Sequence, residues 1–146
     1  MNRHFCASVL IIDKRTKKIL LVKHKKFDKW VQPGGHIEEN EVPEEAAIRE
    51  AYEETGLNIK LIGERFPRED DGVRPFAVQY NRGKKGDLHI DIVYVAVSYD
   101  NREFILNEQE SLDIAWFSRN ELENIPVFPD IKISMDRLLR EYLGVE

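Results

Sequence analysis

The sequence predicts an α/β (α+β) fold in which helices cover a mixed sheet. Three observations predict it: strand-like apolar runs open the chain, one helical segment follows, and further strands precede a C-terminal helix. The 146 residues suit one domain of ordinary size, which we assign to residues 1–146. A chain of this length can bury a sizeable core without disulfides or structural metals.

The N-terminal half is expected to contain two strands, a glycine turn and a helix. Phe5–Asp13 and Lys18–His24 are apolar runs separated by a polar turn, which is typical of paired strands. The adjacent Gly34–Gly35 after a proline marks a tight turn with close backbone approach. A helix is expected over Pro43–Thr55, because proline suits a first turn and Gly56 suits the stop.

The C-terminal half is expected to contain four strands, a short helix and a closing amphipathic helix. The predicted strands are Ile59–Phe66, Phe76–Tyr80, Leu88–Tyr99 and Ile114–Phe117, and the predicted helices are Asn120–Glu123 and Asp130–Leu143.

Composition excludes several classes of protein. The net charge of −5, from 27 acidic and 22 basic side chains, argues against a protein that binds long nucleic acid through a basic surface. No apolar run approaches the ~20 residues of a membrane helix, and the first residues lack the order of a signal peptide. Cys6 is the single cysteine, so no internal disulfide can form. These features suit a cytoplasmic protein that does not bind membranes.

The predicted helix carries three acidic side chains on one face. Glu50, Glu53 and Glu54 lie at positions i, i+3 and i+4, so they share a face on adjacent turns. The spacing of the residues on the opposite face is typical of a stripe that packs on a core; these residues are Ile48, Ala51, Tyr52 and Thr55.

Three neighbouring carboxylates repel one another, and a multivalent hard cation removes that repulsion. Carboxylate oxygens are ligands that Mg²⁺ prefers, with Mn²⁺ as a substitute, and the absence of a cysteine pair or a helical histidine pair argues against zinc. Arg49 can hold a carboxylate in a forked hydrogen bond and so fix a ligand's orientation. The alternative for such acidic residues, taken without the wider pattern, is a solvated helix face.

The wider pattern resembles the Nudix hydrolase family. Residues 35–57 follow the Nudix box in full, and the matching positions are Gly35, Glu41, Arg49, Glu50, Ala51, Glu53, Glu54, Gly56 and Leu57. Ala51 is smaller than the usual aliphatic residue, and Trp116–Ser118 also looks like the family. The resemblance implies an α/β/α sandwich with a mixed central sheet.

The resemblance also implies roles for residues of the box. Glu50, Glu53 and Glu54 would bind Mg²⁺ or Mn²⁺, with a backbone carbonyl at Gly34 completing the ligand set. Glu41 and Arg49 would orient the ligands. Gly35 would let the backbone pass close to the phosphates, while Ile48 and Leu57 would hold the loop onto the core.

A carboxylate must also accept the proton of the attacking water. In the family this base is a helix glutamate or a carboxylate from a later loop, and Glu108 is our first candidate, with Glu50 second. Glu110 matches the later location as well as Glu108 does. For either loop residue, an acidic solvent loop is the alternative.

Substrate contacts are predicted at Gly35, Lys23, Phe27 and His36. Lys23 either meets phosphates or lies on a solvated face, and Phe27 either stacks on a base or faces the core. His36 lies within the box, where a phosphate or water contact competes with a role outside ligand binding.

The resemblance predicts metal-dependent hydrolysis of a diphosphate linkage in a nucleoside diphosphate derivative, by water attack on phosphorus. The substrate would be a small phosphorylated nucleotide: a nucleoside triphosphate, a nucleotide sugar or an ADP-ribose-like molecule. The protein would be a monomer or homodimer. The alternative is a non-catalytic nucleotide-sensing module, and an isomerase ranks last because Cys6 is poorly placed as a catalytic cysteine.

Overall fold

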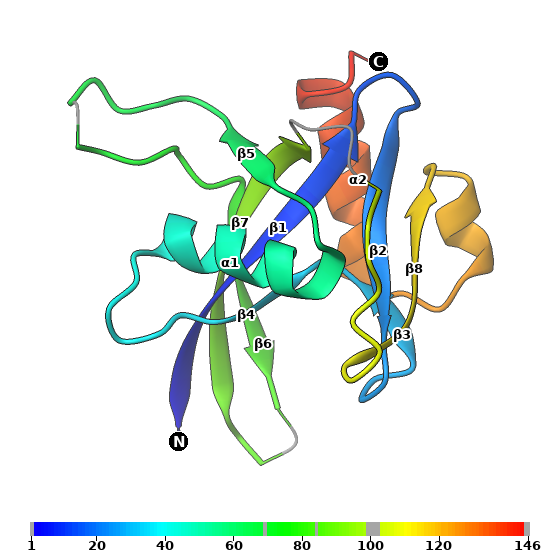
Figure 1. Cartoon of the computed structure of the whole chain (residues 1–146), viewed down its shortest axis with the longest axis horizontal. Helices are drawn as coiled ribbons and strands as arrows, with labels where there is room; N and C mark the ends of the chain where they lie inside the picture. Colours follow the sequence, from blue (N-terminus) through cyan, green and yellow to red (C-terminus); the bar gives the residue numbers. More distant parts are fainter. Residues whose placement is uncertain (1, 69, 84, 99–102, 145–146) are drawn as a thin grey trace.

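The computed structural model describes residues 2–68, 70–83, 85–98 and 103–144 (Figure 1). The elements in chain order are β1 (Arg3–Asp13), β2 (Lys18–His24), β3 (Lys29–Val31), β4 (Gly34–His36), α1 (Pro43–Thr55), β5 (Ile59–Ile62), β6 (Ala77–Arg82), β7 (Leu88–Ser98), β8 (Ser111–Phe117), the short 3₁₀ helix η1 (Glu121–Asn124) and α2 (Pro129–Glu141).

The strands form one mixed sheet. Its main path runs β3-β2-β1-β7-β5, while β4 pairs with β1, β6 with β7 and β8 with β2. The pairing of β1 with β7 is parallel, and the others are antiparallel. The end of β1, Ile11–Asp13, pairs with β2, whereas the segment Cys6–Ser8 pairs with β4. The glycine segment is therefore held directly on the central strand.

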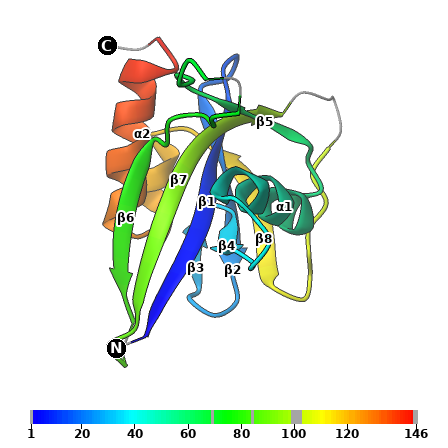
Figure 2. The same cartoon turned by 90° about the vertical axis from the view of Figure 1, so that its left-hand side faces the viewer.

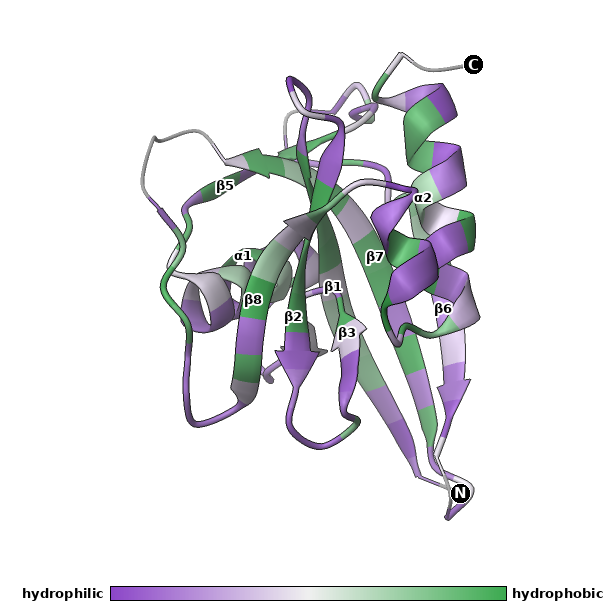
Figure 3. Ribbon diagram, turned by 90° about the vertical axis from the view of Figure 1, so that its right-hand side faces the viewer, coloured by the Kyte–Doolittle hydropathy of each residue, from purple (hydrophilic) through white to green (hydrophobic). Residues whose placement is uncertain are grey.

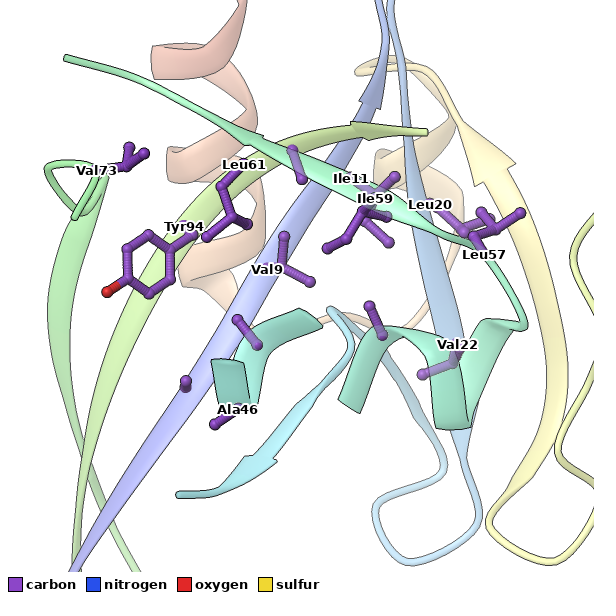
Figure 4. Packing of buried hydrophobic residues seen from close by; sticks show 14 of the residues in the cluster. Val9, Ile11, Leu20, Val22, Ala46, Leu57, Ile59, Leu61, Val73 and Tyr94 are labelled. Carbon is purple, nitrogen blue, oxygen red and sulfur yellow. The ribbon is translucent and has the colours of Figure 1, made fainter. Parts of the chain in front are cut away.

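The helices lie on opposite faces of the sheet (Figure 2). A buried cluster that includes Val9, Ala46, Leu57 and Tyr94 lies on the α1 side (Figure 4). A second cluster that includes Leu10 and several α2 residues lies on the other side. The predicted α/β/α sandwich with a mixed central sheet is confirmed. No helix among the described residues is long and apolar enough to cross a membrane.

Most predicted elements are present, and the differences lie in short or irregular segments. The helix predicted at Pro43–Thr55 has those bounds, and α2 carries the expected mixture of hydrophobic and hydrophilic residues (Figure 3). The strands β3 and β4 were not expected, because three residues are too few to show a period of two. The tight turn predicted at Gly34–Gly35 is wrong: both glycines are extended in β4, although the predicted close backbone approach is present. The strand predicted at Ile59–Phe66 ends at Ile62, before Gly63 at φ 148°. Tyr99, the predicted last residue of another strand, lies outside the described residues.

Candidate active site

The helix α1 packs closely on the sheet through small side chains. Ala46, Ala47, Ala51 and Thr55 are all buried, and the helix lies against β1 and β4. Backbone contacts define both helix ends: the Val42 N–H donates to Glu45 Oε1 at 3.0 Å, and the Gly56 N–H donates to the Tyr52 carbonyl at 2.8 Å. This close approach places the helix's inward face directly beside the glycines of β4.

The predicted core stripe of α1 was half wrong. Ala51 and Thr55 are buried, but Ile48 and Tyr52 are 41% and 50% exposed. Ile48 and Tyr52 each follow a buried alanine by one position, which turns their side chains about 100° around the helix axis and toward solvent. Ile48 therefore does not hold the loop onto the core, whereas Leu57 is buried in the α1-side cluster.

Glu54 is a buried carboxyl held by the glycine segment. Its side chain is only 3% exposed, and its Oε2 accepts the Gly34 N–H at 2.8 Å. Burial raises its pKa to about 8, the Gly34 hydrogen bond opposes the rise, and Glu50 and Glu110 add to it. Among the described residues no cationic side chain pairs with Glu54, so it is an acidic group whose charge the protein alone leaves uncompensated.

Glu50 is half-buried against Gly35. A side chain at Gly35 would place its Cβ 2.6 Å from the Glu50 Cδ, so only glycine leaves room for the carboxylate. Burial raises the pKa of Glu50, and the hydrogen bond and charge of Arg49 oppose the rise. The two glycines thus contact the two inward carboxylates by backbone alone.

Arg49 connects the acidic residues of the helix to the preceding loop. It makes a forked pair with Glu41, through Nε to Oε2 at 2.6 Å and Nη2 to Oε1 at 2.9 Å. Its Nη1 donates to Glu50 at 3.0 Å and to Glu53 at 3.2 Å, and its Nη2 donates to the His36 carbonyl at 3.1 Å. The hydrogen bond from Arg49 lowers the pKa of Glu41, so that carboxylate stays ionised. One guanidinium therefore fixes three glutamates relative to the glycine strand.

A cavity of about 550 Å³ opens beside Glu50 and Glu54. Its lining residues are His24, Lys25, Lys26, Gly34, Gly35, Glu50, Glu54, Gln109 and Glu110. The Lys25 N–H donates to the Glu110 carbonyl at 3.1 Å, which joins the β2–β3 hairpin to the loop before β8. The cavity thus has carboxylates from α1 on one wall and two lysines on another, an arrangement suited to a metal-bound phosphate group.

Several predicted site residues lie outside this cavity wall. Glu108 is exposed and does not line the cavity, whereas Glu110 does. Lys23 pairs with Asp28 at 3.6 Å and is also absent from the wall. The sequence analysis did not select Lys26 or Gln109, which also line the cavity. The available sequence signal was that Lys26 lies in the charged loop before the Gly34–Gly35 pair and Gln109 lies between the two candidate glutamates Glu108 and Glu110.

Neither aromatic candidate, Phe27 or His36, lines the cavity. Phe27 is 47% exposed and its ring centroid is 6.0 Å from that of Phe128. His36 is exposed, and its ring stacks on His4 at 5.2 Å and meets His89 at 5.6 Å. The His36 backbone, rather than its ring, contacts the acidic network through Arg49.

The donor set fits a hard divalent cation. In the part of the chain that the structure describes, no three His, Cys, Asp or Glu side chains converge in metal-binding geometry, because Arg49 holds Glu50 and Glu53 instead. However, the Glu50 carboxylate lies against Gly35 and that of Glu54 against the Gly34 N–H, and no cationic side chain in the described part of the chain compensates the charge of the buried Glu54. Oxygen ligands of this kind suit Mg²⁺ or Mn²⁺.

Together, the sandwich, the glycine strand and the arginine-linked glutamates define a Nudix fold with an intact Nudix box. The family model described as NUDIX domain matches residues 2–142, and the chain belongs to the Nudix family.

Individual relatives agree with this assignment. The crystal structure of a NUDIX-family hydrolase from Clostridium perfringens is 35% identical, with 94% of this chain and 99% of that chain covered and a TM-score of 0.76. A Mycobacterium tuberculosis protein named "Putative 8-oxo-dGTP diphosphatase 3" is 32% identical over 111 residues, which cover 75% of this chain and 46% of that protein. The NAD-capped RNA hydrolase NudC of Haemophilus influenzae is 29% identical over 121 residues, 80% of this chain and 40% of that protein. The chain thus spans about half the length, or less, of these two curated relatives.

Proposed function

We propose that this protein hydrolyses a diphosphate linkage in a small nucleotide, with Mg²⁺ or Mn²⁺ as cofactor. The observation that carries the proposal is the buried Glu54, held by the Gly34 N–H beside Glu50 in a cavity that two lysines also line. Relatives named as a diphosphatase and as a capped-RNA hydrolase act on molecules with diphosphate linkages, which supports the same reaction class.

The acidic residues bind the cofactor and orient it. Glu50 and Glu54, with the outer Glu53 and the Gly34 carbonyl, are the proposed ligands. A divalent cation bound there neutralises phosphate oxygens and acidifies a bound water. Arg49 and Glu41 keep the carboxylates from drifting apart, since the guanidinium contacts Glu41, Glu50 and Glu53 together.

The other residues of the cavity bind the substrate and move the proton. Lys25 and Lys26 line the cavity and are assigned to bind phosphate oxygens. Phe27 does not line it, but its exposed ring lies beside the cavity residue His24, and we assign it to stack on a base. Water attacks one phosphorus, a new P–O bond forms, and the bond to the bridging oxygen breaks with that oxygen leaving on the second phosphate. We assign the acceptance of the water's proton to Glu110, because it lines the cavity and Glu108 does not.

The test is a phosphate-release assay over a panel of substrates, coupled to a pyrophosphatase for the nucleoside triphosphates and to a phosphatase for substrates that have no terminal phosphate. The panel contains nucleoside triphosphates, nucleotide sugars and ADP-ribose. An 8-oxo nucleoside triphosphate and NAD-capped RNA are added because the names of the two curated relatives point to those substrates. We expect Mg²⁺-dependent turnover by the wild type that falls at least about a hundredfold in Glu54→Gln, the size of effect that removal of a group essential to catalysis produces.

The matched control is Glu44→Gln, the same chemical change in the first turn of α1, which should retain activity. Tight nucleotide binding without turnover over the whole panel would overturn the proposal and favour a nucleotide-sensing module. Equal activity of Glu54→Gln and Glu44→Gln would overturn the role of the glutamate.

A further inference from the structure

A second polar cluster lies on the face of the sheet opposite α1. Ala7 and Val9 belong to the α1-side cluster, so Ser8 between them points to the α2 side. Asp91 lies on the same face of β7, because Ile92 beside it packs on the α1 side; its register partner on β1 is Cys6, two residues before Ser8. Both are almost fully buried, with Ser8 at 5% and Asp91 at 9% exposure.

Hydrogen bonds link Asp91 to the segment that leads into β4. The Ser8 hydroxyl donates to Asp91 Oδ2 at 2.9 Å, which fixes the hydroxyl's orientation. The same hydroxyl oxygen accepts from Gln32 Nε2 at 3.3 Å, and Gln32 precedes Pro33 and Gly34 directly. A chain of side chains therefore runs from β7 across β1 to the segment before β4.

The pairing of β7 with its neighbouring strands does not explain why a carboxyl is buried at Asp91. Nine residue pairs already join β1 and β7, and Asp91 Oδ1 has no hydrogen-bond partner among the residues that the structure describes. Within the same ranges, Gln79, its register partner on β6, also has a buried oxygen without a partner. Burying acceptors in this way costs stability, and a buried carboxyl kept at such a cost points to a functional role.

The start of the glycine strand β4 is held from both faces of the sheet. On the α1 side, Glu54 accepts the Gly34 N–H. On β1, the Val9 N–H donates to the Pro33 carbonyl at 3.0 Å, and a Cβ on Gly34 would lie 2.5 Å from the Ser8 Cβ. A shift of Ser8 would therefore move the backbone that contacts Glu54.

We propose that Ser8 and Asp91 are positioning residues for the metal site, acting through Gln32 and the Pro33–Gly35 segment from the opposite face of the sheet. The inference rests on the proposed function, in which Gly34 and Glu54 bind a divalent cation. Carboxylate-anchored hydrogen bonds behind a metal ligand fix its orientation and raise metal affinity.

The test measures Mn²⁺ binding without substrate, by electron paramagnetic resonance of the free ion. We expect Ser8→Ala to weaken Mn²⁺ binding about tenfold, the low end of the effect seen when support behind a metal ligand is removed. Asp91→Asn keeps a neutral acceptor for the Ser8 hydroxyl, so this variant should lose less Mn²⁺ affinity than Ser8→Ala does. The double variant should bind no more weakly than Ser8→Ala, because both changes act through one chain of contacts.

The matched control is Ser134→Ala, the loss of another buried hydroxyl on α2, which should leave Mn²⁺ binding unchanged. A purely structural role would lower the melting temperature of Ser8→Ala without changing Mn²⁺ affinity at a temperature where it is folded, and that result would overturn the inference. If Ser8→Ala does not fold, unchanged Mn²⁺ affinity in Asp91→Asn overturns it instead. Mn²⁺ binding by a wild type that hydrolyses no substrate would refute the proposed function while the variants still decide the inference.

Discussion

At the scale of single residues, the adjacent glycines of β4 should respond in opposite ways to the same change. In Gly35→Ala the new Cβ meets the far end of the Glu50 side chain, which can swing away, so stability should change little. In Gly34→Ala the Cβ meets the Ser8 Cβ at 2.5 Å and the Ala7 carbonyl at 2.7 Å, and backbone cannot yield cheaply. We expect Gly35→Ala to lose at least about tenfold in kcat/KM with a near-normal melting temperature, and Gly34→Ala to lose about 1–3 kcal/mol of unfolding free energy.

Thermal unfolding and steady-state kinetics of both variants check this pair. Loss of stability without loss of kcat/KM in Gly35→Ala would contradict the placement of Glu50 against that glycine.

The buried Asp91 should make stability depend on pH. Burial raises its pKa from 3.8 to about 6, although the Ser8 hydrogen bond opposes the rise. A carboxyl with a raised pKa binds protons more tightly in the folded state, so its contribution is fully present below pH 3.8 and is lost as the pH rises through about 6. The rise of about two units corresponds to at most about 3 kcal/mol.

Asp91→Asn removes this titration and places an amide N–H₂ where Oδ1 lies, across from the unpartnered oxygen of Gln79. Urea unfolding of both proteins between pH 4.5 and 7.5 should show the variant gaining stability relative to wild type as the pH rises. Parallel curves would show that Asp91 does not titrate in that range.

At the scale of elements, the distance between α1 and the sheet is set by alanines. Ala51 has no exposed surface, while its neighbour Tyr52 is half-exposed. Ala51→Leu should force the helix away from β1 and β4, which lowers the unfolding free energy by about 1–3 kcal/mol and separates Glu54 from Gly34. Tyr52→Ala removes a larger side chain from the same helix, but it should change neither the unfolding free energy nor the contact between Glu54 and Gly34 appreciably.

Melting temperature and kcat/KM of the two variants test this contact. An Ala51→Leu protein as stable and active as wild type would show that the helix tolerates a wider separation.

The hairpin between β2 and β3 should contribute to substrate binding through Lys25 and Lys26. Both lysines line the cavity wall, so Lys25→Ala and Lys26→Ala should each raise KM several-fold at low salt. The increase in KM should be smaller at high salt, because salt screens the attraction between a lysine and the phosphates. Lys60→Ala, on the exposed side of β5, is the control and should leave KM unchanged. Effects on kcat alone would instead place these lysines outside substrate binding. The measurement is KM at two ionic strengths.

Sequence patterns predicted the elements that repeat a local rule and missed those set by tertiary contacts. The bounds of α1 followed from Pro43 and Gly56, whose backbone preferences act locally. The exposure of Ile48 and Tyr52 did not follow, because the apolar spacing fits more than one helix face, and only the packing on the sheet shows that the face with Ala47 and Ala51 is the buried one. In the candidate site, the spacing of the box located the glutamates of α1. The sequence offered both Glu108 and Glu110 and did not select Lys26, because which loop residues reach the cavity depends on the Lys25–Glu110 backbone contact.

At the scale of the whole molecule, residues on both faces of the sheet contact the strand β4 or the residues just before it. Residues of α1 contact it from one side, and Ser8 with its partners contacts it from the other. The net charge of −5 is not spread evenly over the molecule, because both lysines and glutamates line the cavity. Divalent cations should therefore influence the stability of the whole fold and not only the chemistry of the cavity.

The last prediction follows from this coupling: Mg²⁺ should raise the melting temperature of the folded chain. A ligand that binds only the folded state stabilises it by about 2.7 kcal/mol at a concentration one hundred times its dissociation constant. For a domain of this size, that is a rise of roughly 5–10 °C. Glu54→Gln removes a carboxylate that the fold leaves without a cationic partner among the described residues, so its melting temperature should respond much less to Mg²⁺. The measurement is thermal unfolding of wild type, Glu54→Gln and Glu44→Gln, with MgCl₂ or with NaCl at the same ionic strength. If all three proteins gain equally from Mg²⁺, the gain comes from general screening of negative charge, and the cation does not bind at Glu54.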